Sequence, residues 1–181
     1  ASDAYFTVKG SLTMTAPNGV EAWIVGSSHD ITWTKTGTIA TAKLEYSTNG
    51  FVDELATVVI VASTDATGTP AGTYKYAWTI PDAISSSVKV RISNTADAAV
   101  TDRSDTNFKI AGAFTLTAPN GTEQWTVGTI QTVSWTRTGS IANAKLEYST
   151  NGGTTYPNII IGSTPAAGLT YSWTIPDSVS T

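Results

Sequence analysis

Apolar and polar residues alternate in short stretches along this chain, and turn-forming residues interrupt the alternation every 8–15 residues. Leu12, Met14 and Ala16 alternate with threonines, and Ile31 and Trp33 repeat the pattern farther along. A period of two residues is typical of a strand that buries one of its faces. No stretch shows a helical period, so we expect about seven short strands between residues 11 and 111, arranged as a sandwich of two sheets.

One expected strand is apolar on both faces, and the tryptophans could have either of two roles. Residues 57–62 read TVVIVA and are apolar on both faces, so this strand is covered twice or lies against a neighbour. Tryptophan can pack in a core or stack on a sugar, and position in the chain separates the two roles. Strand positions predict core packing for Trp33, Trp78, Trp135 and Trp173. Trp23 and Trp125 follow a turn and leave both roles open.

The sequence contains an internal repeat. Residues 12–50 and 114–152 are identical at 25 of 39 positions, at an offset of 102 residues. A repeat of this length predicts two domains, each with its own core, rather than units of a small solenoid. We therefore expect an N-terminal strand and linker at 1–10, a first sandwich at 11–111 and a second at 112–181.

The N-terminal segment is a third copy of the end of a repeat. Residues 2–10, SDAYFTVKG, align with residues 104–112, SDTNFKIAG, at the same offset, whereas the second repeat stops before its own copies of 88–93 and 104–110. One hypothesis is a donor strand that completes the second sandwich of a neighbouring copy. Its candidate residues are Ser2, Asp3, Tyr5, Phe6 and Val8. One strand cannot replace two missing ones, so a fragment boundary is the alternative.

Composition excludes several functions. The net charge is −4, the pI is about 4.8 and only 13% of residues are charged, so the basic stripe that nucleic acid requires is missing. There is no cysteine for a disulfide or a thiolate site. No apolar run approaches the roughly 20 residues of a membrane span.

Two polar stretches contain residue types that occur in catalytic or metal-binding sites. Residues 26–30, GSSHD, place serine, histidine and aspartate side by side, but neighbours on an extended chain point to opposite faces, so we expect a polar turn and no enzyme. Asp97, Asp102 and Asp105 lie in one loop-rich segment, and their hard oxygen ligands suit calcium. The alternative is that these aspartates only cap turns. No other cofactor is expected.

The repeated motif resembles a known family. It reads APNG-x-E-x-W-x-V-G, then KLEYSTNG, Y-x-W-T-I-P, VKVRIS and SD-x-x-F-x-I. This pattern resembles the Ig-like N-terminal domain of the Ser/Thr-rich, GPI-anchored yeast cell-wall synthesis proteins, which recurs in tandem in bacterial and archaeal surface proteins. The resemblance implies an all-β chain of tandem seven-stranded Ig-like (fibronectin III-like) β-sandwiches. The second sandwich is then truncated or is completed by a neighbour's strand.

The same resemblance implies a location and a role. We expect an extracellular, cell-surface structural protein that forms a filament, stalk or surface layer and associates with itself or with neighbouring repeats. The alternative is an adhesin or carbohydrate-binding module that binds cell-surface glycans.

Overall fold

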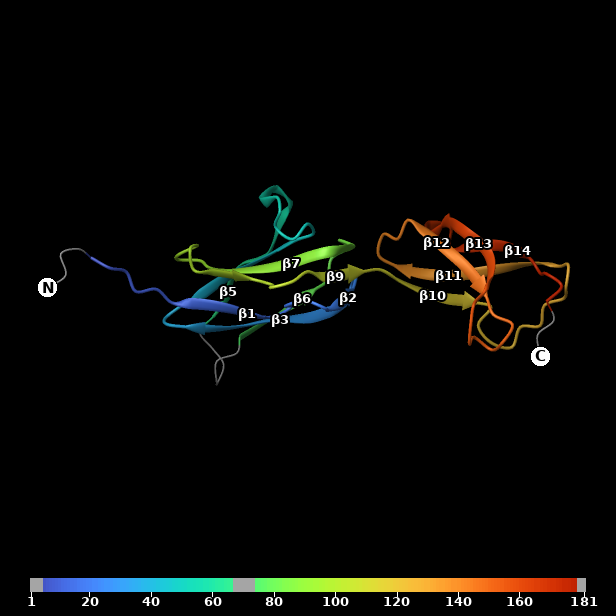
Figure 1. The fold of residues 1–181 in the computed structure, drawn as a ribbon, viewed down its shortest axis with the longest axis horizontal. Coiled ribbons are helices and arrows are strands. Elements are labelled where there is room, and N and C mark those ends of the chain that lie inside the picture. Colours follow the sequence, from blue (N-terminus) through green and yellow to red (C-terminus); the bar gives the residue numbers. More distant parts are fainter. Residues whose placement is uncertain (1–4, 67–73, 179–181) are drawn as a thin grey trace. The chain divides into compact units, whose positions relative to one another are not determined.

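The computed structural model describes residues 5–66 and 74–178, which form an all-β chain divided into two compact units (Figure 1). Unit 1 ends at Ala111 and unit 2 begins at Gly112. The predicted all-β sandwich class is confirmed by the sheets described below. Ser2 and Asp3 of the candidate donor strand lie outside the described residues. None of the described residues belongs to a helix long and apolar enough to cross a membrane.

Unit 1 contains two facing sheets. The first sheet has the strand order β1-β3-β6, and the second has the order β2-β9-β7-β4-β5, with β8 paired to β7. Their bounds are β1 Ser11–Ala16, β2 Ala22–Ile24, β3 Ser28–Thr36, β4 Thr41–Ser47, β5 Thr57–Asp65, β6 Tyr74–Thr79, β7 Ser85–Asn94, β8 Thr101–Arg103 and β9 Phe108–Ala111. A short 3-10 turn, η1 (Glu54–Ala56), precedes β5. The three-residue strands β2 and β8 add to the seven expected, because pairs this short leave no periodicity in the sequence.

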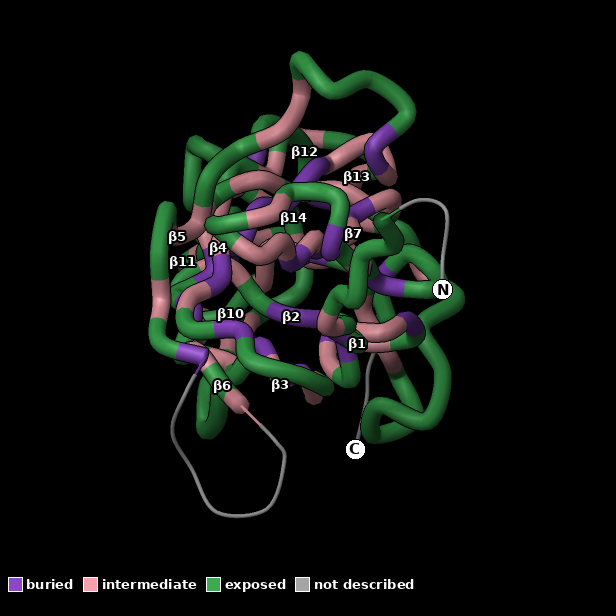
Figure 2. The backbone as a smooth tube through the Cα atoms, turned by 90° about the vertical axis from the view of Figure 1, so that its left-hand side faces the viewer, coloured by how far each residue is buried: buried purple, intermediate pink, exposed green. Residues whose placement is uncertain are grey.

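Alternation along the strands explains the core of unit 1. In β7, Val88, Val90 and Ile92 are fully buried, and the residues between them are half-buried (Figure 2). Trp33 of β3 and Phe108 of β9 meet them from the other strands, with exposed fractions of 0% and 1%. The strand at 57–62 is the edge strand β5, with Val58 and Val59 about half exposed on it. The sequence allowed two possibilities for this strand, coverage on both faces or contact with a neighbour. Within one copy of the chain, the first possibility is therefore wrong.

Unit 2 repeats only part of this arrangement. Its sheets are β10-β11-β14 and β12-β13. The bounds are β10 Ala113–Ala118, β11 Ile130–Thr138, β12 Asn143–Tyr148, β13 Asn158–Pro165 and β14 Thr170–Thr174, with a 3-10 turn, η2, at Ala166–Gly168. Within residues 112–178 no strand takes the places that β2, β7, β8 and β9 have in unit 1.

Candidate functional site: an open aromatic face on unit 2

Three aromatic side chains of unit 2 form what we call the open face: Trp125, Tyr148 and Trp173. Tyr148 ends β12, Trp173 lies on β14, and Trp125 follows the Pro119 turn. All three are half-buried, and they line a cavity of about 490 Å³ together with Val127 and other residues. Trp173, which the sequence predicts as a core residue, packs against the core of unit 2 but is only partly buried, because no strand among residues 112–178 covers its ring.

Unit 1 contains three counterpart rings that are covered by other strands. Trp23, Tyr46 and Trp78 are the counterparts, and their exposed fractions are 7%, 8% and 6%. The strands β7 and β9 cover them, and the Phe108 ring of β9 lies 5.0 Å from the Trp23 ring. The difference in exposure between the two faces follows from these two strands.

The open face keeps the geometry of the covered one. The Trp125–Trp173 centroids are 6.1 Å apart at 70°, against 6.1 Å and 72° for Trp23–Trp78. The Tyr148–Trp173 centroids are 5.1 Å apart at 45°, against 5.1 Å and 46° for Tyr46–Trp78. The rings of unit 2 thus have the same mutual arrangement as the covered rings of unit 1.

The turn that carries Trp125 is also preorganised. The Glu123 carboxylate accepts hydrogen bonds from the backbone N–H groups of Asn120 (2.9 Å) and Gly121 (2.8 Å). Those N–H groups, with that of Asn120 first, hold the pKa of Glu123 below its usual value. In unit 1 the Glu21 carboxylate binds Asn18 and Gly19 at the same distances. The two turns therefore share the carboxylate hydrogen bonds, but Gly19 and Val20 have φ of 122° and 66°, and Gly121 and Thr122 have no positive φ, so the backbone shapes differ.

Other apolar side chains of unit 2 are also more exposed than their counterparts in unit 1. Leu12 and Met14 of β1 are 5% and 2% exposed, but their counterparts Phe114 and Leu116 on β10 are each 45% exposed. Val127 is 46% exposed. Apolar surface left in water on this scale is typical of an interaction site in a soluble domain. The aromatic motif could have indicated the site, but only the missing coverage reveals it.

The three calcium candidates lie in the structure as partners of other protein groups. Asp97 pairs with Lys9 at 2.7 Å, and this hydrogen bond lowers the pKa of Asp97. Asp102 accepts a hydrogen bond from the Met14 N–H at 2.7 Å, and Asp105 accepts one from the Asn18 side-chain amide at 2.7 Å. The described residues bring no three His, Asp or Glu side chains together as a metal-ligand group. Calcium binding by these aspartates stays a prediction.

Among the serine, histidine and aspartate at residues 27–30, Ser27 and His29 contact each other, and Asp30 binds elsewhere. The His29 ring stacks on Trp23 with centroids 4.5 Å apart, and its Nε2 lies 3.0 Å from the Ser27 hydroxyl. The Asp30 carboxylate instead accepts from Lys75 at 2.9 Å. In a catalytic triad the carboxylate orients the histidine, and here it binds a lysine on the neighbouring strand β6.

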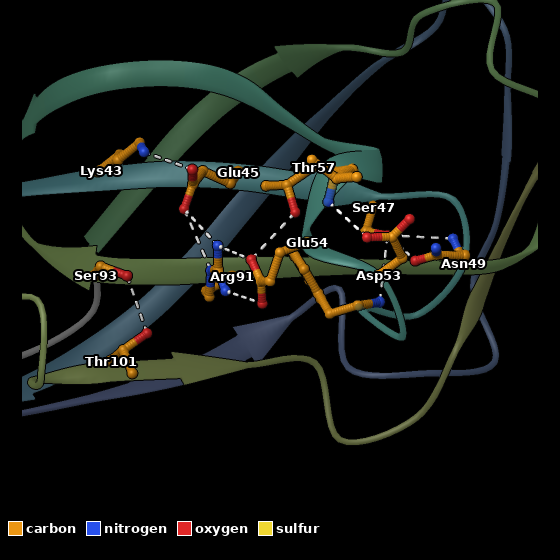
Figure 3. A network of polar contacts seen from close by, with 12 residues as sticks. Lys43, Glu45, Ser47, Asn49, Asp53, Glu54, Thr57, Arg91, Ser93 and Thr101 are labelled. Carbon is orange, nitrogen blue, oxygen red and sulfur yellow. Dashed lines mark hydrogen bonds and ion pairs between the residues drawn. The ribbon is translucent and has the colours of Figure 1, made fainter.

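A network of charged side chains covers the outer side of β4 and β7 in unit 1 (Figure 3). Arg91 donates to Glu45 at 3.1 Å and to both carboxylate oxygens of Glu54 at 2.9 Å, and Lys43 pairs with Glu45 at 2.5 Å. The guanidinium also lies 4.7 Å from the centre of the Phe51 ring. The Arg91 hydrogen bond lowers the pKa of Glu54. These groups satisfy one another and tie β4 to β7, so the network stabilises the sheet.

Comparison with known proteins adds little beyond the fold. No protein-family model matches the chain, and no curated protein matches it either. One similar solved structure is that of the CbhA fibronectin(III)-like modules of Clostridium thermocellum. It is 18% identical, covers 90% of this chain and 77% of its own, and has a TM-score of 0.27. At this TM-score the similarity carries no argument about function, and the resemblance to the yeast cell-wall family stays a prediction.

Proposed function

We propose that this protein is a structural component of the cell exterior, a building block of a filament, stalk or surface layer whose copies associate with one another. The observation that supports the proposal is apolar surface exposed at two places, the half-buried rings of the open face and the N-terminal segment. Tyr5, Phe6 and Val8 are 107%, 82% and 84% exposed. Two such surfaces on one chain suit repeated association between copies.

The tandem architecture supports a mechanical role. Both units are built from strands, and a single residue, Gly112, separates β9 from β10. The extracellular location rests on the resemblance of the sequence motif to repeats of surface proteins. A protein of this kind needs no catalytic residue, and its function depends on the stability of its sandwiches and on its contacts.

Electron microscopy of the purified full chain, paired with light scattering over a concentration series, tests the proposal. Ordered filaments or sheets whose repeat corresponds to one or two sandwich units support it. A monodisperse monomer at every concentration contradicts self-assembly and leaves the sandwiches as spacers.

Glycan binding is the second candidate, and one observation favours it. Trp125, Tyr148 and Trp173 expose ring surface in a cavity that also holds the polar groups of Glu123 and Gln124, and aromatic rings beside polar side chains are a common setting for small ligands. A glycan array probed with the full chain tests this candidate. Hits that disappear in Trp125→Ala support it, and an array without hits contradicts it.

A further inference from the structure

We infer that two copies of the chain join through the edge strand β5 of unit 1, as an antiparallel pair centred on Val58. The inference rests on the proposed self-association and specifies a contact for it. It commits to a partner, a direction and a register, each of which follows from the second sheet of unit 1.

Strand β5 ends its sheet and has a partner on one side only. It pairs with β4, and no other described strand pairs with it. Residues 5–10, which the sequence predicts as a strand, form none in the structure and so pair with no edge. Strand β13 has the same place beside β12 in unit 2, so a free edge here is a feature of the repeat. Contact with a neighbour is the remaining possibility that the sequence allowed for residues 57–62.

The other edges of unit 1 carry features that discourage pairing with another chain. The Met14 N–H of β1 is bound to the Asp102 carboxylate at 2.7 Å. Strand β6 carries Lys75, and β2 is only three residues long. Residues 57–64 of β5, in contrast, include no charged residue and no proline. Among the described strands of unit 1, β5 therefore has the edge most open to another strand.

The hydrogen bonds of β7 fix the direction of the backbone groups in β4. The N–H and the carbonyl of Val90 both bind Ser104, so they face away from β4. Backbone groups alternate in direction along a strand, so those of Arg91 face β4, where Glu45 is the paired residue. The backbone groups of Glu45 therefore face β7.

The same alternation identifies the free backbone groups of β5. Tyr46 follows Glu45, so its N–H and carbonyl face β5, where Val58 is the paired residue. The groups of Val58 thus face β4. Those of its neighbours Thr57 and Val59 point away from β4, into the space beside the edge.

Two bulges limit the usable edge to the first three residues of β5. Thr57, Val58 and Val59 pair regularly with β4, and the register shifts on either side of the Leu44–Val61 pair. Bulges interrupt a ladder and turn the strand away from a partner. We therefore expect contact with another strand only at 57–59, and an association of modest strength.

One register satisfies all the outward groups of these three residues. When a two-fold axis passes beside Val58, the two strands run antiparallel and Thr57 of each copy lies opposite Val59 of the other. Each such pair exchanges its N–H and carbonyl groups, so every outward group of both residues is bound. The Val58 side chains, each 47% exposed in one copy, then cover one another across the axis.

Charge favours a second copy as the partner. Because residues 57–64 are uncharged, a charged strand would find nothing to pair with on this edge. In the proposed register Asp53 and Glu54 of one copy fall, by residue count, beside Ser63 and Ala62 of the other. Two copies, each with a net charge of −4, therefore meet here without bringing like charges together.

Strand β13 of unit 2 provides a comparison within the same chain. Its Asn158 pairs with β12 as Val58 pairs with β4, so Pro157 stands at the position of Thr57. Proline has no N–H to donate, and asparagine places a polar group where the valines would meet. We therefore expect β5 to pair with a second copy and β13 not to do so.

A charge at the axis tests the register. Val58→Lys brings two like charges together and removes the apolar contact, so it should weaken self-association about 10-fold or more. Asn158→Lys is the matched control on β13 and should change the association constant less than about 3-fold. Light scattering of the full-length variants over a concentration series measures both effects. Equal effects, or unchanged assembly of Val58→Lys, overturn the inference and leave the proposed function intact, whereas a wild-type chain that never associates contradicts both.

A mixing experiment distinguishes the two-fold pair from any other contact of β5. Val58→Lys and Val58→Glu should each associate weakly alone and form a one-to-one complex when mixed, because opposite charges then meet across the axis. A mixture that associates no better than either variant alone overturns the inference.

Amide exchange of the wild-type chain keeps the test decisive if a variant fails to fold. The N–H groups of Thr57 and Val59 point to water in a single copy, so their exchange should slow as the concentration rises. The Ile159 N–H has the equivalent position in β13 and should exchange at an unchanged rate. Quenched-exchange NMR resolves these amides. Equal slowing at all three, or no slowing in a sample that has assembled, overturns the inference.

Discussion

Replacement of Phe108 by alanine removes from unit 1 the side chain whose place is empty in unit 2. The ring is 1% exposed and packs on Trp23 at 5.0 Å and 57°. Strand β9 is held between β2 and β7, so the backbone cannot move in to close the space. Phenylalanine-to-alanine changes in cores that cannot collapse cost about 3–5 kcal/mol. A loss of that size is a large share of the roughly 5–15 kcal/mol that stabilises a typical domain.

The assay is urea unfolding of the full chain, read by hydrogen-exchange mass spectrometry so that peptides of the two units report separately. With a denaturant dependence of about 2 kcal/mol per molar urea, a loss of about 4 kcal/mol lowers the unfolding midpoint of unit 1 by roughly 2 M. The midpoint of unit 2 should not move. Phe114→Ala in β10 is the matched control, because its ring is 45% exposed and its loss should cost unit 2 only about 1 kcal/mol.

A small effect would refute the reasoning. If Phe108→Ala lowers the stability of unit 1 by no more than Phe114→Ala lowers that of unit 2, then the ring on Trp23 does not close the sandwich. The higher exposure of Trp125 than of Trp23 would then have a cause other than the absence of this ring.

Three further expectations concern charge. Arg91→Met should destabilise unit 1 by about 1–3 kcal/mol in urea unfolding, because Glu45, whose side chain is 9% exposed, loses its guanidinium partner; unchanged stability would contradict this. The pKa of Glu54 is lowered by Arg91 on folding, so its contribution is complete above its unfolded pKa of about 4.5 and is lost as the pH falls through the folded value. The acid sensitivity of unit 1 should therefore shrink in Arg91→Met, while that of unit 2, where Glu123 has backbone donors, stays the same. Calorimetric titration should decide calcium binding by the 97–105 segment, and absence of heat with an unchanged melting temperature would remove the prediction.

The architecture was accessible from the sequence because the signals for it are local. Alternation around Trp33 and along Val88–Ile92 sets which side of a strand is buried, and the turn residues set where strands end. The second copy of the motif then predicts the second unit. Two short strands, β2 and β8, escaped prediction, because three residues that pair with a distant edge carry no pattern of their own.

The site was less accessible because exposure depends on what covers a side chain. The residues around Trp173, YSWTIPD, differ at one position from those around the buried Trp78, YAWTIPD. Trp173 is nevertheless half-buried, because β7 and β9 have no counterparts within residues 112–178. The aspartates show the opposite case. Proximity in sequence suggested a shared calcium ion, which stays a prediction, but it did not indicate that Asp102 accepts from the Met14 N–H or that Asp97 pairs with Lys9. Side-chain partners of this kind come from distant strands and cannot be read from spacing.

A cryo-electron microscopy map of the assembled full chain tests the central claim most directly. A structural component should give ordered filaments or sheets in which copies contact one another through the same repeated interface. Particles that contain a single copy at every concentration would contradict the proposed role.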